Sequence, residues 1–307
     1  MSVVDVVVIG TILKETIYFA DGRVVGPVIG SPLAYSSVVM RAQSTKVGIV
    51  TYYGDDVSDI IGELDALDRR NVVPYAHTTT NHLIYREDGT KIVEYVRRTP
   101  MIKYEDICSD FLDCQFFKIC PMDYEVDLEL VKKLHASNKT VFVDLGGYGG
   151  ATSDIRYSVE TEYGKSVIDT LCVNSSIIKA SAEDLQSIIP GRTALEASDY
   201  LLNAGAKVAV VTCGGDGAFY KYKGEEAVFF KPYNAVSEEP HGQLDFTGTG
   251  DSFGAGFMAS YVKYQDIERA VKNGNATASL VIQRSGGCIV DRMPTKERVE
   301  HRIATGE

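Results

Sequence analysis

Residues 244–259 read Leu-Asp-Phe-Thr-Gly-Thr-Gly-Asp-Ser-Phe-Gly-Ala-Gly-Phe-Met-Ala, a glycine-rich turn that runs directly into apolar and small residues. Glycines let the backbone turn so that several N–H groups point to one place. The N-terminus of the helix that follows adds about half a positive charge. Gly248, Thr249 and Gly250 therefore form a candidate anion hole at the start of a predicted helix.

Asp251 follows in the first turn of this helix, beside the candidate anion hole. A carboxylate repels a bound phosphate, so it suits static phosphate binding poorly. It does suit a base that removes the proton from a hydroxyl attacking the phosphate. The alternative is that Asp251 only caps a glycine-rich helix start, where its charge favours the helix dipole.

Two other phosphate-binding motifs are excluded by their spacing. Gly164-Lys165-Ser166 is the only Gly-Lys-Ser, but Val159 stands where a P-loop requires its first glycine. The pattern Gly248-x-Gly250-x-x-x-Gly254 is one residue too long for a dinucleotide fingerprint, and it does not follow the first strand.

Strand-like and helix-like runs alternate along the chain. The strand-like runs cover residues 3–9, 46–51, 114–119, 140–143 and 207–212, and the helix-like runs cover 32–42, 57–70, 125–136 and 193–204. Strands that alternate with helices imply βαβ units. The sequence therefore predicts an α/β fold with a central, mostly parallel sheet.

Two regions depart from this alternation. Residues 15–26 hold two short runs around Asp21-Gly22, and residues 81–86 and 91–96 flank Asp88-Gly89, both hairpin signals. They predict a small separate sheet with an apolar face, formed in the second region by Leu83, Ile84, Ile92, Val93 and Tyr95. An ordinary surface hairpin is the alternative. Without a linker or an internal repeat, residues 1–307 read as one domain.

Composition limits the function classes. The 307 residues carry 31 Lys and Arg against 42 Asp and Glu, a net charge of −11, so no chain-wide basic field for nucleic acid exists. No apolar run reaches the roughly 18 residues of a membrane span, and no signal peptide is evident. Six cysteines without a C-x-x-C pair read as reduced thiols. We expect a cytoplasmic protein without nucleic-acid or membrane partners.

Residues 245–253 (DFTGTGDSF) resemble the signature of the ribokinase-like (PfkB) family of carbohydrate kinases, approximately D-T-x-G-A-G-D-x-F, with Thr249 in the usual alanine place. Further stretches resemble family motifs in the same order: Gly10-Thr11-Ile12-Leu13-Lys14-Glu15, Ile29-Gly30-Ser31-Pro32-Leu33-Ala34-Tyr35, residues 47–56, Val211-Thr212-Cys213-Gly214-Gly215-Asp216-Gly217 and Gly274-Asn275-Ala276. The resemblance implies a three-layer ribokinase-like fold with a small β-lid over residues 15–26 and 81–97.

The resemblance also implies transfer of the ATP γ-phosphate to an alcohol with Mg²⁺, with Asp251 as the base and residues 248–250 as the anion hole. The nucleotide would contact Thr212, Gly214, Gly217 and Asn275.

Two cation sites are weaker expectations. Ser181-x-x-Asp184 is the nearest counterpart of the family's N-x-x-E motif, in which Asp184 would reach Mg²⁺ through water. The alternative is a helix N-cap. A monovalent cation near Asp245 is left open.

For the acceptor, Glu15 stands where the family usually has an aspartate that holds substrate hydroxyls, with Gly30 and Ser31 nearby. The alternative is that Glu15 only starts a hairpin and faces water. We expect a sugar or cyclitol as substrate. A nucleoside, or a non-catalytic sensor that binds sugar or nucleotide, is the alternative. The lid implies a homodimer.

Overall fold

The computed structural model describes residues 3–62, 64, 68–87, 91–240 and 242–306. Within them, nine strands form one sheet in the order β13-β12-β11-β10-β9-β8-β1-β4-β5. Their bounds are β1 Val6–Ile9, β4 Val47–Tyr53, β5 Asp68–Pro74, β8 Phe116–Ile119, β9 Thr140–Asp144, β10 Ile177–Ser181, β11 Val208–Thr212, β12 Ala218–Tyr222 and β13 Val228–Phe230.

The sheet is parallel from β5 to β11, and β12 and β13 pair antiparallel at one edge. The central strand β1 reads Val-Val-Val-Ile and all four residues are buried. Continuous β-branched runs of this kind suit strands that are covered on both faces. The predicted α/β class with a mostly parallel sheet is confirmed.

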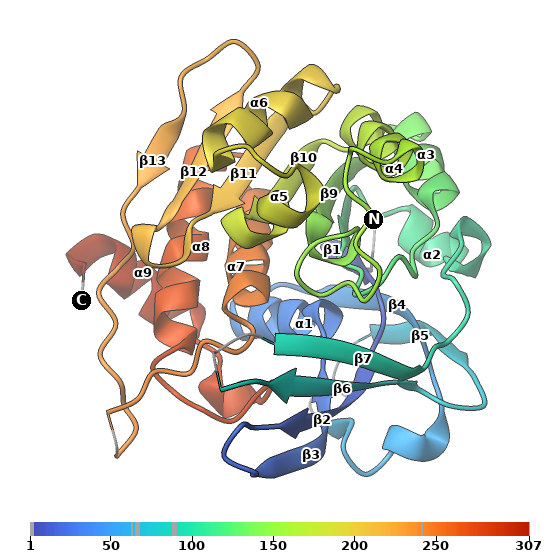
Figure 1. Cartoon of the computed structure of the whole chain (residues 1–307), viewed down its shortest axis with the longest axis vertical. Coiled ribbons are helices and arrows are strands. Elements are labelled where there is room, and N and C mark those ends of the chain that lie inside the picture. Colours follow the sequence, from blue (N-terminus) through green and yellow to red (C-terminus); the bar gives the residue numbers. More distant parts are fainter. Residues whose placement is uncertain (1–2, 63, 65–67, 88–90, 241, 307) are drawn as a thin grey trace.

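Helices cover both faces of the sheet, which makes three layers (Figure 1). One face packs against α1 Pro32–Ala42, α7 Thr249–Tyr264 and α8 Ile267–Val281. The other packs against α3 Leu128–Ala136, α4 Glu162–Asn174, α5 Ala182–Ile188 and α6 Ala194–Asn203. The short α2 Ser109–Leu112 and the C-terminal α9 Lys296–Thr305 complete the described helices. None of these helices combines the length and apolarity that crossing a membrane requires.

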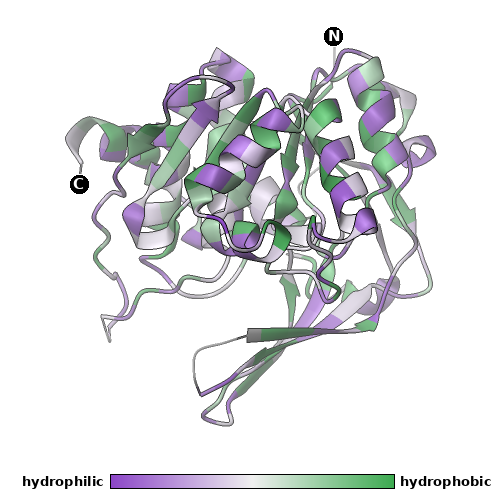
Figure 2. Cartoon of the chain, turned by 45° about the horizontal axis from the view of Figure 1, so that its top comes forward, coloured by the Kyte–Doolittle hydropathy of each residue, from purple (hydrophilic) through white to green (hydrophobic). Residues whose placement is uncertain are grey.

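A second sheet of four strands, in the order β3-β2-β6-β7, projects from the three-layer body (Figure 2). Its strands are β2 Leu13–Tyr18, β3 Val24–Gly30, β6 Thr79–Tyr85 and β7 Lys91–Arg97. β2 and β3 form the predicted hairpin around Asp21-Gly22, whereas Asp88-Gly89 lies outside the described residues. A small separate sheet therefore forms from the two regions that break the βα alternation.

The prediction that Leu83, Ile84, Ile92, Val93 and Tyr95 form one apolar face is wrong. Neighbouring side chains of a strand alternate between its two faces. Leu83 pairs with Val93, and both line a cavity between the small sheet and the body. Ile84 pairs with Ile92 in the next register position, so these two point the other way. The five residues are divided between an inner and an outer face.

The helix predicted over residues 57–70 is also wrong. A short 3-10 turn, Asp55–Val57, follows β4, and β5 begins at Asp68. Its residues 71–74 pair in parallel with residues 50–53 of β4. Residues 68–70 of the predicted helix therefore belong to the edge strand of the main sheet, and residues 63 and 65–67 lie outside the described residues.

Candidate functional site

The glycine-rich turn begins α7 as predicted. Gly248 is the N-cap, with φ of 71° in the left-handed region, and Asp251 lies in the first turn. A Cβ on Gly248 would also lie 2.3 Å from Cε1 of Tyr35. Both the backbone conformation and the aromatic ring therefore require glycine here.

A buried arginine that the sequence analysis missed holds the loop before α7. Arg292 is 1% exposed, and its Nη2 donates to the carbonyls of Asp245 at 3.0 Å and Thr247 at 3.1 Å. Its Nη1 donates to the hydroxyl of Tyr35 at 3.3 Å. A lone arginine near the C-terminus carries no motif, so only the fold shows that it supports the turn.

The three candidate anion-hole residues differ in their backbone bonding. The amide of Thr249 donates to the carbonyl of Phe246 at 3.2 Å, and the Thr249 hydroxyl donates to the same oxygen at 2.6 Å. This amide is thus engaged in the turn. Gly250 lies farther along the first turn, whose amides have no partner within the helix. Its Cβ position would be 3.6 Å from Nζ of Lys179.

Lys179 is a second residue that sequence reasoning missed. It lies in β10, is 3% exposed, and its Nζ lies 2.9 Å from Oδ2 of Asp144. Burial acts to lower the pKa of Lys179, but the carboxylates of Asp144, Asp184 and Asp251 outweigh burial and raise it. A protonated ammonium therefore lies below the N-terminus of α7. A lysine inside an otherwise buried strand was the available signal.

A cavity of about 110 Å³ brings the predicted acceptor residues to Asp251. Glu15, Gly30, Ser31, Gly248 and Asp251 all line it. A Cβ on Gly30 would lie 3.1 Å from Oε2 of Glu15, so the glycine leaves room for this carboxylate. Glu15 is thus part of the cavity wall as well as of the hairpin strand β2.

The strands of the small sheet complete the walls of this cavity. Oε1 of Glu15 accepts a hydrogen bond from Nδ2 of Asn81 at 3.0 Å, and Asn81 is fully buried with its Oδ1 unpaired among the described residues. Ser31 has φ of 122° and caps α1 through its hydroxyl, which accepts from the Ala34 amide at 3.1 Å. Unfavourable backbone at a cavity wall is typical of functional sites. Asn81 is a polar site residue that the strand pattern alone did not single out.

Gly217 and Asn275, two of the residues predicted to contact the nucleotide, both lie beside residues 230–231. A Cβ on Gly217 would lie 2.1 Å from the carbonyl oxygen of Phe230, and Nδ2 of Asn275 donates to the Lys231 carbonyl at 3.4 Å. Gly214 has φ of 54° and open space around its Cβ position, and Thr212 ends the neighbouring strand β11. Thr212 ends β11, Gly214 and Gly217 lie in the short turn between β11 and β12, and Asn275 lies in α8.

Asp184 forms a capping box at the start of α5. Its Oδ2 accepts from the amide of Ser181 at 2.7 Å and its Oδ1 from the amide of Ala151 at 2.9 Å. The helix-cap alternative is therefore observed. Within the described residues, no group of three or more His, Cys, Asp and Glu side chains could hold a metal ion.

A glycine-rich helix N-terminus, with a carboxylate beside it and a cavity that both line, is the arrangement expected of a phosphoryl-transfer site for small molecules. The fold matches solved structures of that class. A ribokinase from Thermotoga maritima aligns with a TM-score of 0.76 at 18% identity, over 98% of this chain and 100% of that chain. A nucleoside kinase from Methanocaldococcus jannaschii aligns with a TM-score of 0.74 at 18% identity, over 98% of both chains.

The sequence comparisons agree with the fold. The family model "pfkB family carbohydrate kinase" matches residues 154–296. A cytidine kinase from Thermococcus kodakarensis is 27% identical over 288 residues, which is 92% of this chain and 97% of that protein. The match to this family model and the ribokinase fold confirm the resemblance to the ribokinase-like (PfkB) family read from residues 245–253.

Proposed function

We propose that this protein is an ATP-dependent kinase that phosphorylates a hydroxyl of a nucleoside. The observation that carries the proposal is that Asp251 and Glu15, from opposite ends of the chain, line one cavity at the N-terminus of α7. One carboxylate would bind the acceptor and the other would activate it.

In this proposal, acceptor binding, proton removal and charge stabilisation fall to different residues of the site. Glu15, oriented by Asn81, accepts hydrogen bonds from substrate hydroxyls. Asp251 takes the proton of the attacking hydroxyl, an effect that typically contributes about 10²–10⁴-fold. The first turn of α7 and the ammonium of Lys179 stabilise charge on the transferred phosphoryl group.

The nucleotide would lie along Thr212, Gly214, Gly217 and Asn275. Mg²⁺, when bound with ATP, neutralises phosphate charge and takes most of its ligands from phosphates and water. Asp184 would reach it only through water, because both of its oxygens already accept backbone amides. A monovalent cation near Asp245 stays a prediction, and the guanidinium of Arg292 already lies 3.4 Å from that carboxylate.

The apolar wall of the cavity favours a nucleoside over a bare polyol. Besides Glu15 and Asp251, the cavity is lined by the apolar side chains of Leu13, Ile17, Val28, Leu83, Val93 and Met122. Such a wall suits a flat base, while the carboxylates suit ribose hydroxyls. The similarity to a cytidine kinase over 92% of the chain supports this choice. A sugar or cyclitol is the second candidate, because Glu15 and Asn81 would bind any vicinal diol.

The small sheet acts as a lid in this proposal. The cavity of about 110 Å³ is smaller than the roughly 300 Å³ of ordinary ligand pockets, so the sheet must move outward to admit a substrate. Tyr95 of β7 donates to the carbonyl of Thr152 at 3.2 Å and holds the sheet against the body.

Val24 and Val96 are 58% and 55% exposed on the small sheet, and we propose that a second copy covers them.

We place the activity in the cytoplasm. All six cysteines are free thiols, the state in which a reducing compartment keeps cysteines.

The test is a turnover assay with ATP and Mg²⁺ against a panel of nucleosides, cyclitols and sugars. Phosphorylation of a nucleoside with the highest kcat/KM supports the proposal. Turnover of a cyclitol or sugar alone establishes the second candidate. Ligand binding in calorimetry without any turnover would show a sensor rather than an enzyme.

A further inference from the structure

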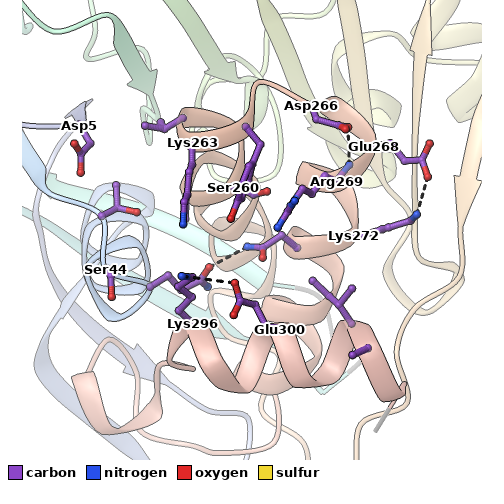
Figure 3. Close-up of a pocket in the computed structure, with 18 residues that line it drawn as sticks. Asp5, Ser44, Ser260, Lys263, Asp266, Glu268, Arg269, Lys272, Lys296 and Glu300 are labelled. Carbon is purple, nitrogen blue, oxygen red and sulfur yellow. Dashed lines mark hydrogen bonds and ion pairs between the residues drawn. The ribbon is translucent and has the colours of Figure 1, made fainter.

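A second and larger cavity, of about 680 Å³, lies at the other end of α7 from Asp251 (Figure 3). Its walls come from the C-terminal ends of α1 and α7, the first half of α8, and α9. Lys263 lies twelve residues after Asp251, which is about 18 Å along the helix axis. None of the acceptor residues and none of the predicted nucleotide residues lines this cavity, and its volume falls within the ordinary range for small ligands.

The acidic side chains that line this cavity all have partners. Asp5 accepts from the Lys46 amide at 2.8 Å, Asp266 from the Arg269 amide at 2.9 Å, Glu268 pairs with Lys272 at 2.6 Å, and Glu300 pairs with Lys296 at 3.7 Å. Glu268 and Glu300 each pair with a lysine, whereas the backbone amides that Asp5 and Asp266 accept carry no charge.

Lys263 and Arg269, two cations of the same cavity, form no ion pair within the described residues. In the part of the chain that the structure describes, no carboxylate lies within 4.0 Å of the ammonium of Lys263 or the guanidinium of Arg269. Figure 3 shows both side chains reaching the hollow, Lys263 from α7 and Arg269 from α8. The lining carries four acidic and four basic side chains and so has no net charge, and Lys263 and Arg269 are its two cations without an ion pair in the described residues.

The helix dipole explains only one of these cations. Lys263 lies in the last turn of α7, where a positive charge is favourable. Arg269 lies in the first turn of α8, where a positive charge is unfavourable. Its guanidinium lies 3.5 Å from the ring centre of Tyr264, and this stacking leaves the N–H edge available for a planar, bidentate anion contact.

A third polar group provides independent support. Ser260 lines the cavity between these cations and is only 5% exposed, and its hydroxyl has no hydrogen-bond partner among the described residues. Buried hydroxyls are normally paired, so a group from outside the chain is expected to complete this one.

We propose that this cavity binds a small molecule carrying a phosphate group, held by Lys263, Arg269 and the hydroxyl of Ser260. Phosphate oxygens match the fork of an arginine and accept from a lysine and a serine at once. The site is distinct from the kinase centre, and its occupancy does not depend on phosphoryl transfer.

The experiment uses pyrophosphate as the probe in isothermal calorimetry. Because pyrophosphate can also bind at the N-terminus of α7, the variants identify the site. In the double variant Lys263→Gln/Arg269→Gln, we expect one binding event to be lost or its Kd to rise at least tenfold. Lys132→Gln, which removes a surface lysine on α3, should leave the isotherm unchanged.

Crystals of the wild-type chain soaked in tungstate provide the second measurement, with a heavy-atom peak expected between Lys263 and Arg269. Equal isotherms for the wild type and the double variant, or tungstate only at residues 248–250, would overturn the proposal. If the double variant does not fold, Ser260→Ala replaces it, and a Kd for pyrophosphate unchanged from the wild type counts against the site. None of these readouts uses turnover, so they stand apart from the kinase assay.

Discussion

The ammonium of Lys179 and the carboxylate of Asp144 lie 2.9 Å apart on neighbouring strands, and their side chains are 4% and 6% exposed. The pair lies directly below the N-terminus of α7, because Gly250 approaches the same ammonium. It therefore joins the core of the sheet to the site where phosphate is expected.

Lys179→Met should destabilise the protein by about 3–5 kcal/mol, since it leaves the Asp144 carboxylate buried without its cation. Urea unfolding followed by circular dichroism measures this change. The double variant Lys179→Met/Asp144→Asn should recover part of the loss. Lys165→Met, which breaks an exposed pair with Asp169, is the control and should change stability by less than about 1 kcal/mol. Equal effects at Lys179 and Lys165 would contradict the argument.

Asp251→Asn should lower kcat by roughly 10²-fold or more, because the amide cannot take the proton of the acceptor hydroxyl. The KM for ATP should stay within a few fold, since the backbone of α7 is unchanged. Steady-state kinetics on the best substrate measures both constants. Asp251 would lose its role as the base if the variant kept its turnover.

Glu15→Gln should raise the KM for the acceptor several fold and leave the KM for ATP unchanged. The neutral amide accepts fewer hydrogen bonds from substrate hydroxyls than the carboxylate, and unpaired hydroxyls cost about 1–3 kcal/mol. Glu94→Gln is the matched control, because Glu94 is exposed on β7 of the same sheet. Equal acceptor KM values in the two variants would show that Glu15 does not bind the substrate.

Asp56 should make the small sheet sensitive to acid. Burial acts to raise the pKa of Asp56, but hydrogen bonds from the hydroxyl of Thr78 at 2.7 Å and its amide at 2.9 Å, together with Lys14, lower it overall. A lowered pKa in the folded state gives stability that is present above the unfolded value of about 3.9 and is lost as pH falls below it.

Asp56→Asn should therefore lower the free energy of unfolding by about 1 kcal/mol at pH 7 and flatten its loss below pH 4. Thermal unfolding at pH 7, 5 and 3.5 tests this, with Asp59→Asn at an exposed neighbouring position as the control. An unchanged pH profile would show that the hydrogen bonds from Thr78 and the ion pair with Lys14 contribute nothing to the free energy of unfolding.

The outer face of the small sheet should pair with a second copy. Val24→Lys/Val96→Lys should convert a dimer into a monomer in light scattering at micromolar concentration, because it places charge at two exposed apolar side chains of the small sheet. Val173→Lys on α4, at a valine that is also 55% exposed, should leave the dimer intact. A wild-type monomer would refute this assembly.

Local sequence determined the features that depend on neighbours in the chain. Pro32–Ala42 is a helix with the predicted bounds, and the glycine-rich turn starts α7 because Gly248 can adopt a positive φ. Alternating strands and helices were enough to predict the parallel sheet. Glu15, Gly30 and Asp251 were identified because each stands in a short motif.

Tertiary structure decided what depends on residues far apart in the chain. Residues 68–70, at the end of the run predicted as a helix, instead begin the edge strand β5, which pairs with β4. Lys179, Arg292 and Asn81 belong to no motif, and they become part of the site only when β10, the C-terminal loop and β6 meet. The reason is physical: a buried charge or amide is defined by the partners that surround it, and those partners come together only through folding.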